Sequence, residues 1–330
     1  MASSSTHQNR RNALKQTAKE TKAMTPTIAT SLPHLNPTLS LRFSLETLPP
    51  LDPTKCPHFH LSRDPSSHGT PISVLPSDSF DAAITMPSIL LSLPSSPQTH
   101  TELEKSNLTH LHSSCAAPSN LNPSTAARVA VLNMASEHNP GGGWMNGAAA
   151  QEEALCFRST LASSLHKSRH YPIPDRSGIW TKDVVIFRTS MAEGHELMVP
   201  AVEAERLPVV SVLSVAGIRR PRVESVNGKS VFAEAGDREL TRDKMRLCLR
   251  MAAERGHTMV VLGALGCGAF RNPPEEVAEC WGEVLREGEF AGGWFRGVWF
   301  AVFDRKGDGN LPVFKRWLDG KVVGVVGDGV

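Results

Sequence analysis

Two adjacent carboxylic acids that follow a run of glycines are the residues of this sequence best suited to chemistry. Pro140 precedes three glycines, and after seven intervening residues the chain reads Gln-Glu-Glu; the residues concerned are Gly141, Gly142, Gly143, Gln151, Glu152 and Glu153. Successive glycines leave the backbone without Cβ atoms, so it can lie directly against a ligand. The N–H groups of such a loop can form a concavity for phosphate or sugar oxygens. A placed carboxyl group can transfer protons as a general acid or base.

Position decides between a catalytic and a purely structural interpretation of these residues. A glycine run can be a flexible surface turn, and acids at a helix start can simply meet the helix dipole. The glycines, however, follow the apolar run 129–133, which reads as a covered strand, and open α/β sheets bind ligands at the carboxyl ends of their strands. On a helix over 151–167, one stripe would carry Ala154, Phe157, Leu161 and Leu165. Glu153 lies at the edge of that stripe and Glu152 nearly opposite, so we expect Glu153 to be partly buried, with a raised pKa.

Strands and helices alternate along the rest of the chain. We expect strands at 71–75, 129–133, 184–187, 209–215, 259–262 and 298–303. A helix capped by Ser77 or Asp78 follows the first of them, and further helices are expected at 151–167, 237–255, 274–286 and 311–318. This alternation predicts an α/β fold with three layers, α/β/α, in which helices cover both faces of a mixed central sheet.

One large domain with an N-terminal extension fits this pattern better than two domains. In residues 1–70 we expect a helix from about Asn12 to Met24, with Leu14, Ala18 and Ala23 on its apolar face, and then Pro/Ser-rich irregular chain packed on the core. Residues 71–320 would form the main domain, with a low-complexity insertion at 88–126, and 321–330 a C-terminal tail. An alternative to the N-terminal helix is a mitochondrial transit peptide, because the start of the chain contains Arg and Ser and is poor in acids.

The overall composition constrains the ligands and the compartment. The chain has 35 basic and 33 acidic side chains and a net charge of +2, so an anionic ligand must be held by a local site. We see no apolar stretch long enough to span a bilayer. The six cysteines include no CxxC pair, which favours a reduced intracellular compartment, nucleus or cytoplasm. The spacing of Cys56, His58 and His60 could suit a metal, but two further ligands are missing, and we expect neither a metal nor another cofactor.

The segment NPGGGWMNGAAAQEEALCFRSTL resembles the signature of poly(ADP-ribose) glycohydrolases, and in particular that of their microbial-type branch. Other stretches resemble the same family, namely RNALKQTAKET, SVLPSDSFDAA, TKDVVIFR, GHTMVVLGALGCGAFRNPPEEVAECW and FRGVWFAVFD. The resemblance covers most of residues 10–320 apart from the Pro/Ser-rich segments. It implies a macrodomain fold and the hydrolysis of ribose–ribose O-glycosidic bonds in poly(ADP-ribose), with release of ADP-ribose.

The resemblance also implies roles for the acid pair. Glu153 would be the catalytic residue and would act in turn as general acid and general base. Glu152 would bind the hydroxyls of the ribose units beside the scissile bond. Gln151 would help to fix the catalytic loop formed by Gly141, Gly142 and Gly143.

A second loop and several isolated residues would contact the substrate. By the same resemblance, the substrate diphosphate would be wrapped by Gly266, Cys267, Gly268, Ala269 and Phe270, with Phe270 against the terminal ribose. Asp78 stands where macrodomains often place an acid near the adenine. Ser136 occupies a position at which many binding modules carry Asn, which leaves open whether Asn133 or Asn139 contacts the substrate.

Three other functions compete with this interpretation. A non-catalytic macrodomain that binds ADP-ribose would need the glycine loops but not the acid pair. A hydrolase of mono(ADP-ribose) on protein or nucleic acid would use a differently shaped pocket. A nucleotide-binding oxidoreductase is disfavoured, because the glycine order in GALGCG is reversed relative to the dinucleotide fingerprint. As partners we expect poly(ADP-ribose), ADP-ribose and poly(ADP-ribosyl)ated proteins, without membrane binding or sequence-specific nucleic-acid binding, and we expect a monomer.

Overall fold

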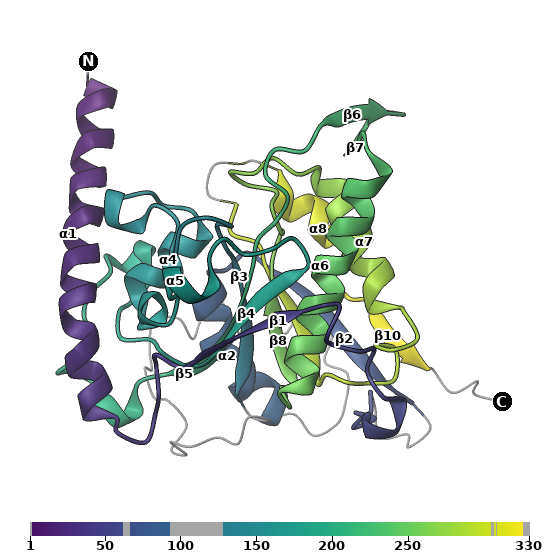
Figure 1. Cartoon of the computed structure of the whole chain (residues 1–330), viewed down its shortest axis with the longest axis horizontal. Coiled ribbons are helices and arrows are strands. Elements are labelled where there is room, and N and C mark those ends of the chain that lie inside the picture. Colours follow the sequence, from purple (N-terminus) through teal and green to yellow (C-terminus); the bar gives the residue numbers. More distant parts are fainter. Residues whose placement is uncertain (1, 62–66, 93–127, 305–306, 308, 326–330) are drawn as a thin grey trace.

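A mixed sheet of eight strands forms the centre of the computed structural model, which describes residues 2–61, 67–92, 128–304, 307 and 309–325 (Figure 1). The strand order is β1-β4-β5-β3-β8-β9-β2-β10. These strands are β1 Ser40–Ser44, β2 His68–Leu75, β3 Val129–Met134, β4 Ser177–Val185, β5 Val209–Val215, β8 Met259–Leu262, β9 Gly297–Ala301 and β10 Val322–Val325. A separate hairpin pairs β6 Val223–Val226 with β7 Lys229–Phe232 and projects from the body of the molecule (Figure 1).

The central strands β5, β3, β8, β9 and β2 run parallel to one another. The antiparallel pairs lie toward the edges, where β4 joins β5 and β10 joins β2. Parallel strands that are covered on both faces read as near-continuous apolar runs. For this reason the expected strands at 209–215 and 259–262 are confirmed residue for residue.

Helices cover both faces of the sheet, which confirms the three-layer prediction. On one face the core joins alternate residues of the strands to α6 Ala235–Glu254, α7 Pro274–Leu285 and α8 Asn310–Leu318. On the other face it joins the intervening strand residues to α2 Ser79–Ser92 and α4 Gln151–Arg158, with α1 Ala2–Ser31 outside α4 (Figure 1). In β3, for example, Ala130 and Leu132 face the first core and Val129 and Val131 the second.

The helix expected over 151–167 is shorter than its periodicity predicts. α4 ends at Arg158, because Ser159 is extended and pairs with Ile186 just beyond β4. A short helix, α5 Lys167–His170, follows after a turn. Ala154 of the stripe is half-buried, and the other three residues are buried although two of them lie beyond the end of α4: Phe157, Leu161 and Leu165.

The N-terminal extension holds more regular structure than expected. α1 continues through Pro26 to Ser31. Leu14 and Ala18 are buried as predicted, whereas Ala23 is exposed and Thr21 takes the inner position instead.

Two strands and part of a helix lie where we expected irregular chain. β1 lies in the segment expected to be irregular, and β10 in the expected tail. α2 runs into the expected insertion as far as Ser92, and the rest of 88–126 lies outside the described residues. No described helix is both long and apolar enough to cross a membrane.

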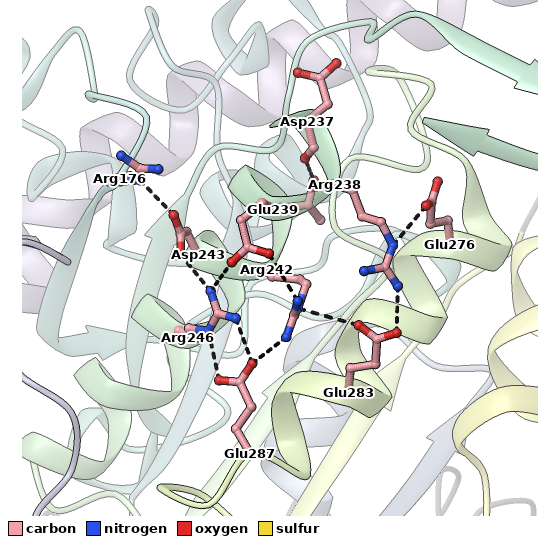
Figure 2. A network of polar contacts seen from close by, with 11 residues as sticks. Arg176, Asp237, Arg238, Glu239, Arg242, Asp243, Arg246, Glu276, Glu283 and Glu287 are labelled. Atoms are coloured by element: carbon pink, nitrogen blue, oxygen red, sulfur yellow. Dashed lines mark hydrogen bonds and ion pairs between the residues drawn. The ribbon is translucent and has the colours of Figure 1, made fainter. Parts of the chain in front are cut away.

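A network of ion pairs joins α6 to α7 (Figure 2). Arg246 donates to both carboxylate oxygens of Glu287 at 2.8 Å, and Arg238 donates to Glu283 at 2.6 Å. Glu276 of α7 pairs with Arg238 and also accepts the backbone N–H of Phe232 in β7. Isolated surface ion pairs stabilise little, but networks of bidentate arginines hold elements in fixed positions. This network therefore fixes α7, which begins just after the Gly-rich loop that follows β8.

Candidate active site

The three glycines fold directly over the side chain of Glu153. Gly141 and Gly142 have positive φ angles of 71° and 60°, which other residues rarely adopt. A Cβ on Gly142 would lie 2.4 Å from Glu153 Oε1 and 3.0 Å from Glu152 Oε2. The Gly143 N–H donates to Glu153 Oε1 at 2.8 Å, so the loop and the carboxylate hold each other in place.

Glu153 also closes the start of helix α4. Its Oε2 accepts the N–H of Ala150 at 2.8 Å, and the residue is 7% exposed. Each carboxylate oxygen therefore has one protein donor and keeps further lone-pair capacity. This arrangement leaves the group able to exchange a proton with a molecule bound beside the loop.

Glu152 is buried as well, at 4% exposure. Its Oε2 accepts the Ser136 N–H at 2.7 Å, and Asn133 Nδ2 lies 3.5 Å from Oε1. Burial, supported by the neighbouring charge of Glu153, raises the pKa of Glu152 to about 8. At neutral pH this carboxyl group is therefore mostly protonated.

The helical-wheel argument that separated the two acids is wrong. It placed Glu152 on the outer side of the helix, but both acids are buried. The reason is that they occupy the first turn of α4, which is covered by the glycine loop and by the end of β3. A helical wheel predicts only which residues face the sheet, and it does not include the loop that covers the first turn. We expected a raised pKa at Glu153, whereas the raised pKa that burial produces in the pair is that of Glu152.

Gln151 fastens the start of α4 to β3. Its Oε1 accepts the Met134 N–H at 2.9 Å, and its Nε2 donates to the Leu132 carbonyl at 2.7 Å. Asn133, on the same strand, is fully buried and lies beside Glu152, whereas Asn139 is exposed. Asn139 contributes its carbonyl, which accepts the Gly142 N–H and shapes the loop.

The second glycine loop, residues 266–270, lies at the same edge of the sheet because β8 pairs with β3. Gly266 has a φ of 75°, and a Cβ there would lie 2.5 Å from Asn272 Nδ2. Asn272 Nδ2 donates to the carbonyls of Gly266 at 3.1 Å and Ile218 at 2.6 Å. It thereby joins this loop to the loop after β5. The remaining members are Cys267, which is buried, Phe270, which is half-buried, and Gly268 and Ala269, which are exposed.

Arg219 connects the two loops and is a residue that sequence reasoning missed. Its Nε donates to Glu137 at 2.7 Å, just before the first glycine loop, and its guanidinium lies 5.0 Å from the centre of the Phe270 ring. The only indication of this role in the sequence was that Arg219 follows strand 209–215 and so lies at the same sheet edge as the two glycine loops. The contacts of Arg219 thus hold Phe270 close to the chain that leads to the acids.

Asp78 lies at the carboxyl end of β2, as predicted, but its carboxylate is engaged within the protein. It caps α2 through the Phe80 N–H at 2.8 Å and pairs with Arg158 at 2.5 Å. Arg158, from the end of α4, is buried and also pairs with Asp81 at 2.7 Å. Burial raises the pKa of Asp81 to about 6, an effect that Arg158 opposes and Asp78 reinforces. The sequence analysis overlooked Arg158, which ties the Asp78 region to the helix that carries the acids.

The chain's single tyrosine, Tyr171, is a further residue that we did not predict. Its hydroxyl is buried and has no hydrogen-bond partner among the described residues. Burial raises its pKa, and the nearby charge of Glu152 acts in the same direction. The Tyr171 phenol is therefore a buried, unpaired polar group near Glu152.

Helix α1 packs against the chain that follows the first glycine loop. Arg11 Nε donates to the Asn146 carbonyl at 2.9 Å. A Cβ on Gly147, which has a φ of 73°, would lie 2.4 Å from the Arg11 carbonyl. Thr21 donates to the Phe157 carbonyl in α4 at 2.7 Å. α1 therefore supports both ends of the acid-bearing segment.

Cys56 and His58 turn toward a backbone carbonyl. Cys56 Sγ and His58 Nδ1 each lie 3.1 Å from the Gly292 carbonyl, and His60 pairs through its backbone with His68. In the part of the chain that the structure describes, no group of three or more His, Cys, Asp or Glu side chains is arranged to hold a metal ion.

Comparison with known proteins agrees with this geometry. A model of the microbial-type PARG catalytic domain matches residues 11–189. The chain is similar to the crystal structure of poly(ADP-ribose) glycohydrolase (PARG) from Thermomonospora curvata, with a TM-score of 0.61 and 23% identity, over 92% of this chain and 99% of that chain. It is also similar to PARG from Deinococcus radiodurans in complex with ADP-ribose, with a TM-score of 0.53 and 27% identity, over 84% of this chain and 93% of that chain. No curated protein matches the chain.

Proposed function

This chain belongs to the microbial-type PARG family, and from that membership we propose that it hydrolyses the ribose–ribose O-glycosidic bonds of poly(ADP-ribose) and releases ADP-ribose. It is thus a glycosidase, built on a fold of the macrodomain type. Its substrate would be the free polymer or the polymer carried by modified proteins. The Deinococcus structure holds ADP-ribose, and a Thermomonospora PARG structure holds the inhibitor ADP-HPD.

The observation that carries this proposal is the convergence of two buried carboxyl groups on Gly142. Both lie within 3.0 Å of the position that a Cβ of this residue would occupy. A protein that only binds ADP-ribose has no need for two acids in a place where they repel each other and lose solvation. A glycosidase does need acids there, because bond cleavage requires a proton donor at the leaving oxygen and a base for the attacking water.

Glu153 would serve both roles in succession. In its protonated form it gives its proton to the 2′ oxygen of the departing ribose as the C1″–O2′ bond breaks, which leaves an oxocarbenium ion on the other ribose. A water molecule then attacks C1″, and the Glu153 carboxylate takes a proton from that water. Glu153 is then protonated again, and the water has supplied the hydroxyl group on C1″ and the proton that restores Glu153. Proton transfer by a placed side chain accelerates such steps by roughly a hundred- to ten-thousand-fold.

Substrate binding would be divided between the two loops. Glu152, mostly protonated, can donate a hydrogen bond to a ribose oxygen, and Tyr171 and Asn133 lie beside it. The 266–270 loop would wrap the diphosphate with its backbone N–H groups. The diphosphate would also offset the positive charge that develops on the ribose. Phe270 would pack against the terminal ribose, and Asp78, fixed by Arg158, would lie on the adenine side.

Incubation of the purified protein with labelled poly(ADP-ribose), with separation of monomer from oligomer products, tests this proposal. We expect ADP-ribose to accumulate, and the pattern of oligomers will show whether cleavage also occurs within the polymer. A parallel reaction with a mono(ADP-ribosyl)ated protein is the control. Binding of ADP-ribose without any cleavage would show a reader, and release from the mono-modified protein alone would show a mono(ADP-ribosyl) hydrolase. Either outcome would refute the proposal.

A further inference from the structure

Four exposed arginines gather on two adjoining loops at the carboxyl edge of the sheet. Arg219, Arg220 and Arg222 follow β5, and Arg271 directly follows Phe270. The two loops are joined by a hydrogen bond from the Arg220 N–H to the Phe270 carbonyl at 2.8 Å. The Arg219 guanidinium thus lies near the Phe270 ring, Arg220 and Arg271 adjoin Phe270 through their backbone, and Arg222 follows two residues after Arg220.

The backbone at two of these positions is unusual. Arg220 and Arg271 have positive φ angles of 51° and 58°. Long side chains rarely adopt this conformation, which asparagine or glycine would adopt at lower cost. Unfavourable backbone conformations of this kind cluster at functional sites, where the surrounding structure enforces them. The conformation turns both arginines out of loops that are otherwise anchored by Asn272.

In the described part of the chain, only Arg219 of these four arginines has a close ion-pair partner, Glu137 at 2.7 Å. Among the described residues, neither Arg220 nor Arg271 has an ion-pair partner. Arg222 has only a contact of 3.6 Å with Glu234, in which both side chains are mostly exposed. The exposed cluster thus differs from the arginines of α6, each of which is paired with an acid of the same helix, of α7 or of the segment just after α7: Arg238, Arg242, Arg246 and Arg250. In a chain of net charge +2, the cluster is a local concentration of available positive charge.

We propose that Arg219, Arg220, Arg222 and Arg271 bind the diphosphates of ADP-ribose units beyond the unit held at the cleavage site. This inference depends on the proposed function. Each repeating unit of the polymer carries a diphosphate, and guanidinium groups bind phosphate oxygens in a bidentate manner. The cluster adjoins Phe270, so a polymer that leaves the 266–270 loop meets it next. This continuity favours the substrate polymer over a nucleic acid as the ligand.

The test compares long poly(ADP-ribose) with ADP-ribose itself, which has no unit beyond the cleavage site, in an Arg220→Gln/Arg271→Gln double variant. For the long polymer we expect the Michaelis constant to rise about tenfold and the slope of its logarithm against the logarithm of salt concentration to fall by about 1 to 2. Binding of ADP-ribose in calorimetry should be unchanged. An Arg220→Lys/Arg271→Lys variant should recover only part of the affinity, because it keeps the charge but loses the bidentate contacts. Arg206→Gln, an exposed arginine just before β5 at the opposite edge, is the matched control and should behave as the wild type.

Binding measurements keep this inference distinct from the proposed function. Fluorescence anisotropy with labelled polymer measures binding by the arginines even if the protein releases no ADP-ribose. A protein that binds the polymer but releases no ADP-ribose would overturn only the proposed function. An unchanged affinity of the double variant for long polymer would refute the inference. So would an equal loss of affinity for ADP-ribose, or displacement of the polymer by RNA of equal charge at equal concentration.

Discussion

Substitution of Gly142 by alanine tests the coupling between the first glycine loop and the acids. The added Cβ would lie 2.4 Å from Glu153 Oε1, whereas ordinary van der Waals contact begins near 3.4 Å. The backbone is fixed on both sides, by the Gly142 N–H to the Asn139 carbonyl and by the Gly143 N–H to Glu153. The carboxyl group must therefore move by about 1 Å to make room.

Two separable losses follow from this change. Alanine in a left-handed conformation costs about 1–2 kcal/mol of folding stability. A displacement of a catalytic group by about 1 Å costs roughly a hundredfold in rate. We therefore expect Gly142→Ala to remain folded but to release ADP-ribose from the polymer about a hundredfold more slowly.

Turnover of labelled polymer and chemical denaturation should be measured on the same preparation. The matched control is Gly256→Ala, because Gly256 also has a left-handed backbone, with a φ of 74°, but a Cβ there meets nothing within 4 Å. This control should lose similar stability and keep full activity. If Gly142→Ala is destabilised like the control yet turns over within twofold of the wild type, the loop does not position Glu153 for catalysis.

Two further substitutions test other parts of the site. Glu152→Gln removes a carboxyl group whose pKa rises from 4.5 in the unfolded chain to about 8 in the fold. The folded state holds this proton more tightly, so the wild type should lose stability relative to Glu152→Gln as the pH rises from 5 to 8, by at most about 4 kcal/mol; an equal stability difference at both pH values would contradict this. Asn272→Ala removes the hydrogen bonds to the Gly266 and Ile218 carbonyls, which join the 266–270 loop to the loop after β5, and should cost about 1–3 kcal/mol in denaturation. It should also weaken ADP-ribose binding in calorimetry, and unchanged binding would show that this loop does not contact the ligand.

The elements that position the site could be predicted from local patterns. Strands 209–215 and 259–262 are buried on both faces, so their apolar runs matched the structure without adjustment. α7 carries a proline at its start, where the lost N–H has no intrahelical partner, and its predicted start was correct. Edge strands β1 and β10 could not be predicted in this way. They have mixed exposure, and only pairing with a distant strand defines them.

The composition of the site was easier to predict than its internal arrangement. Motif spacing brought Gln151, the acids and the glycine loop together correctly, because they are close in sequence. The relative burial of Glu152 was missed, since it depends on the Ser136 N–H and on the loop that covers the helix start. The connections made by Arg158 and Arg219 join segments far apart in the chain, and no local pattern reveals such contacts.

Glu153→Gln most directly tests the claim that one carboxyl group cleaves the bond. The amide keeps the shape and can still accept the Gly143 N–H, but it cannot donate and recover the proton. Its NH₂ group faces the Ala150 N–H, so folding must be verified by ADP-ribose binding on the same sample. We expect near wild-type binding of ADP-ribose and a loss of polymer turnover of about a hundred- to ten-thousand-fold. Near-normal release of ADP-ribose by a variant that binds normally would contradict the central role of Glu153.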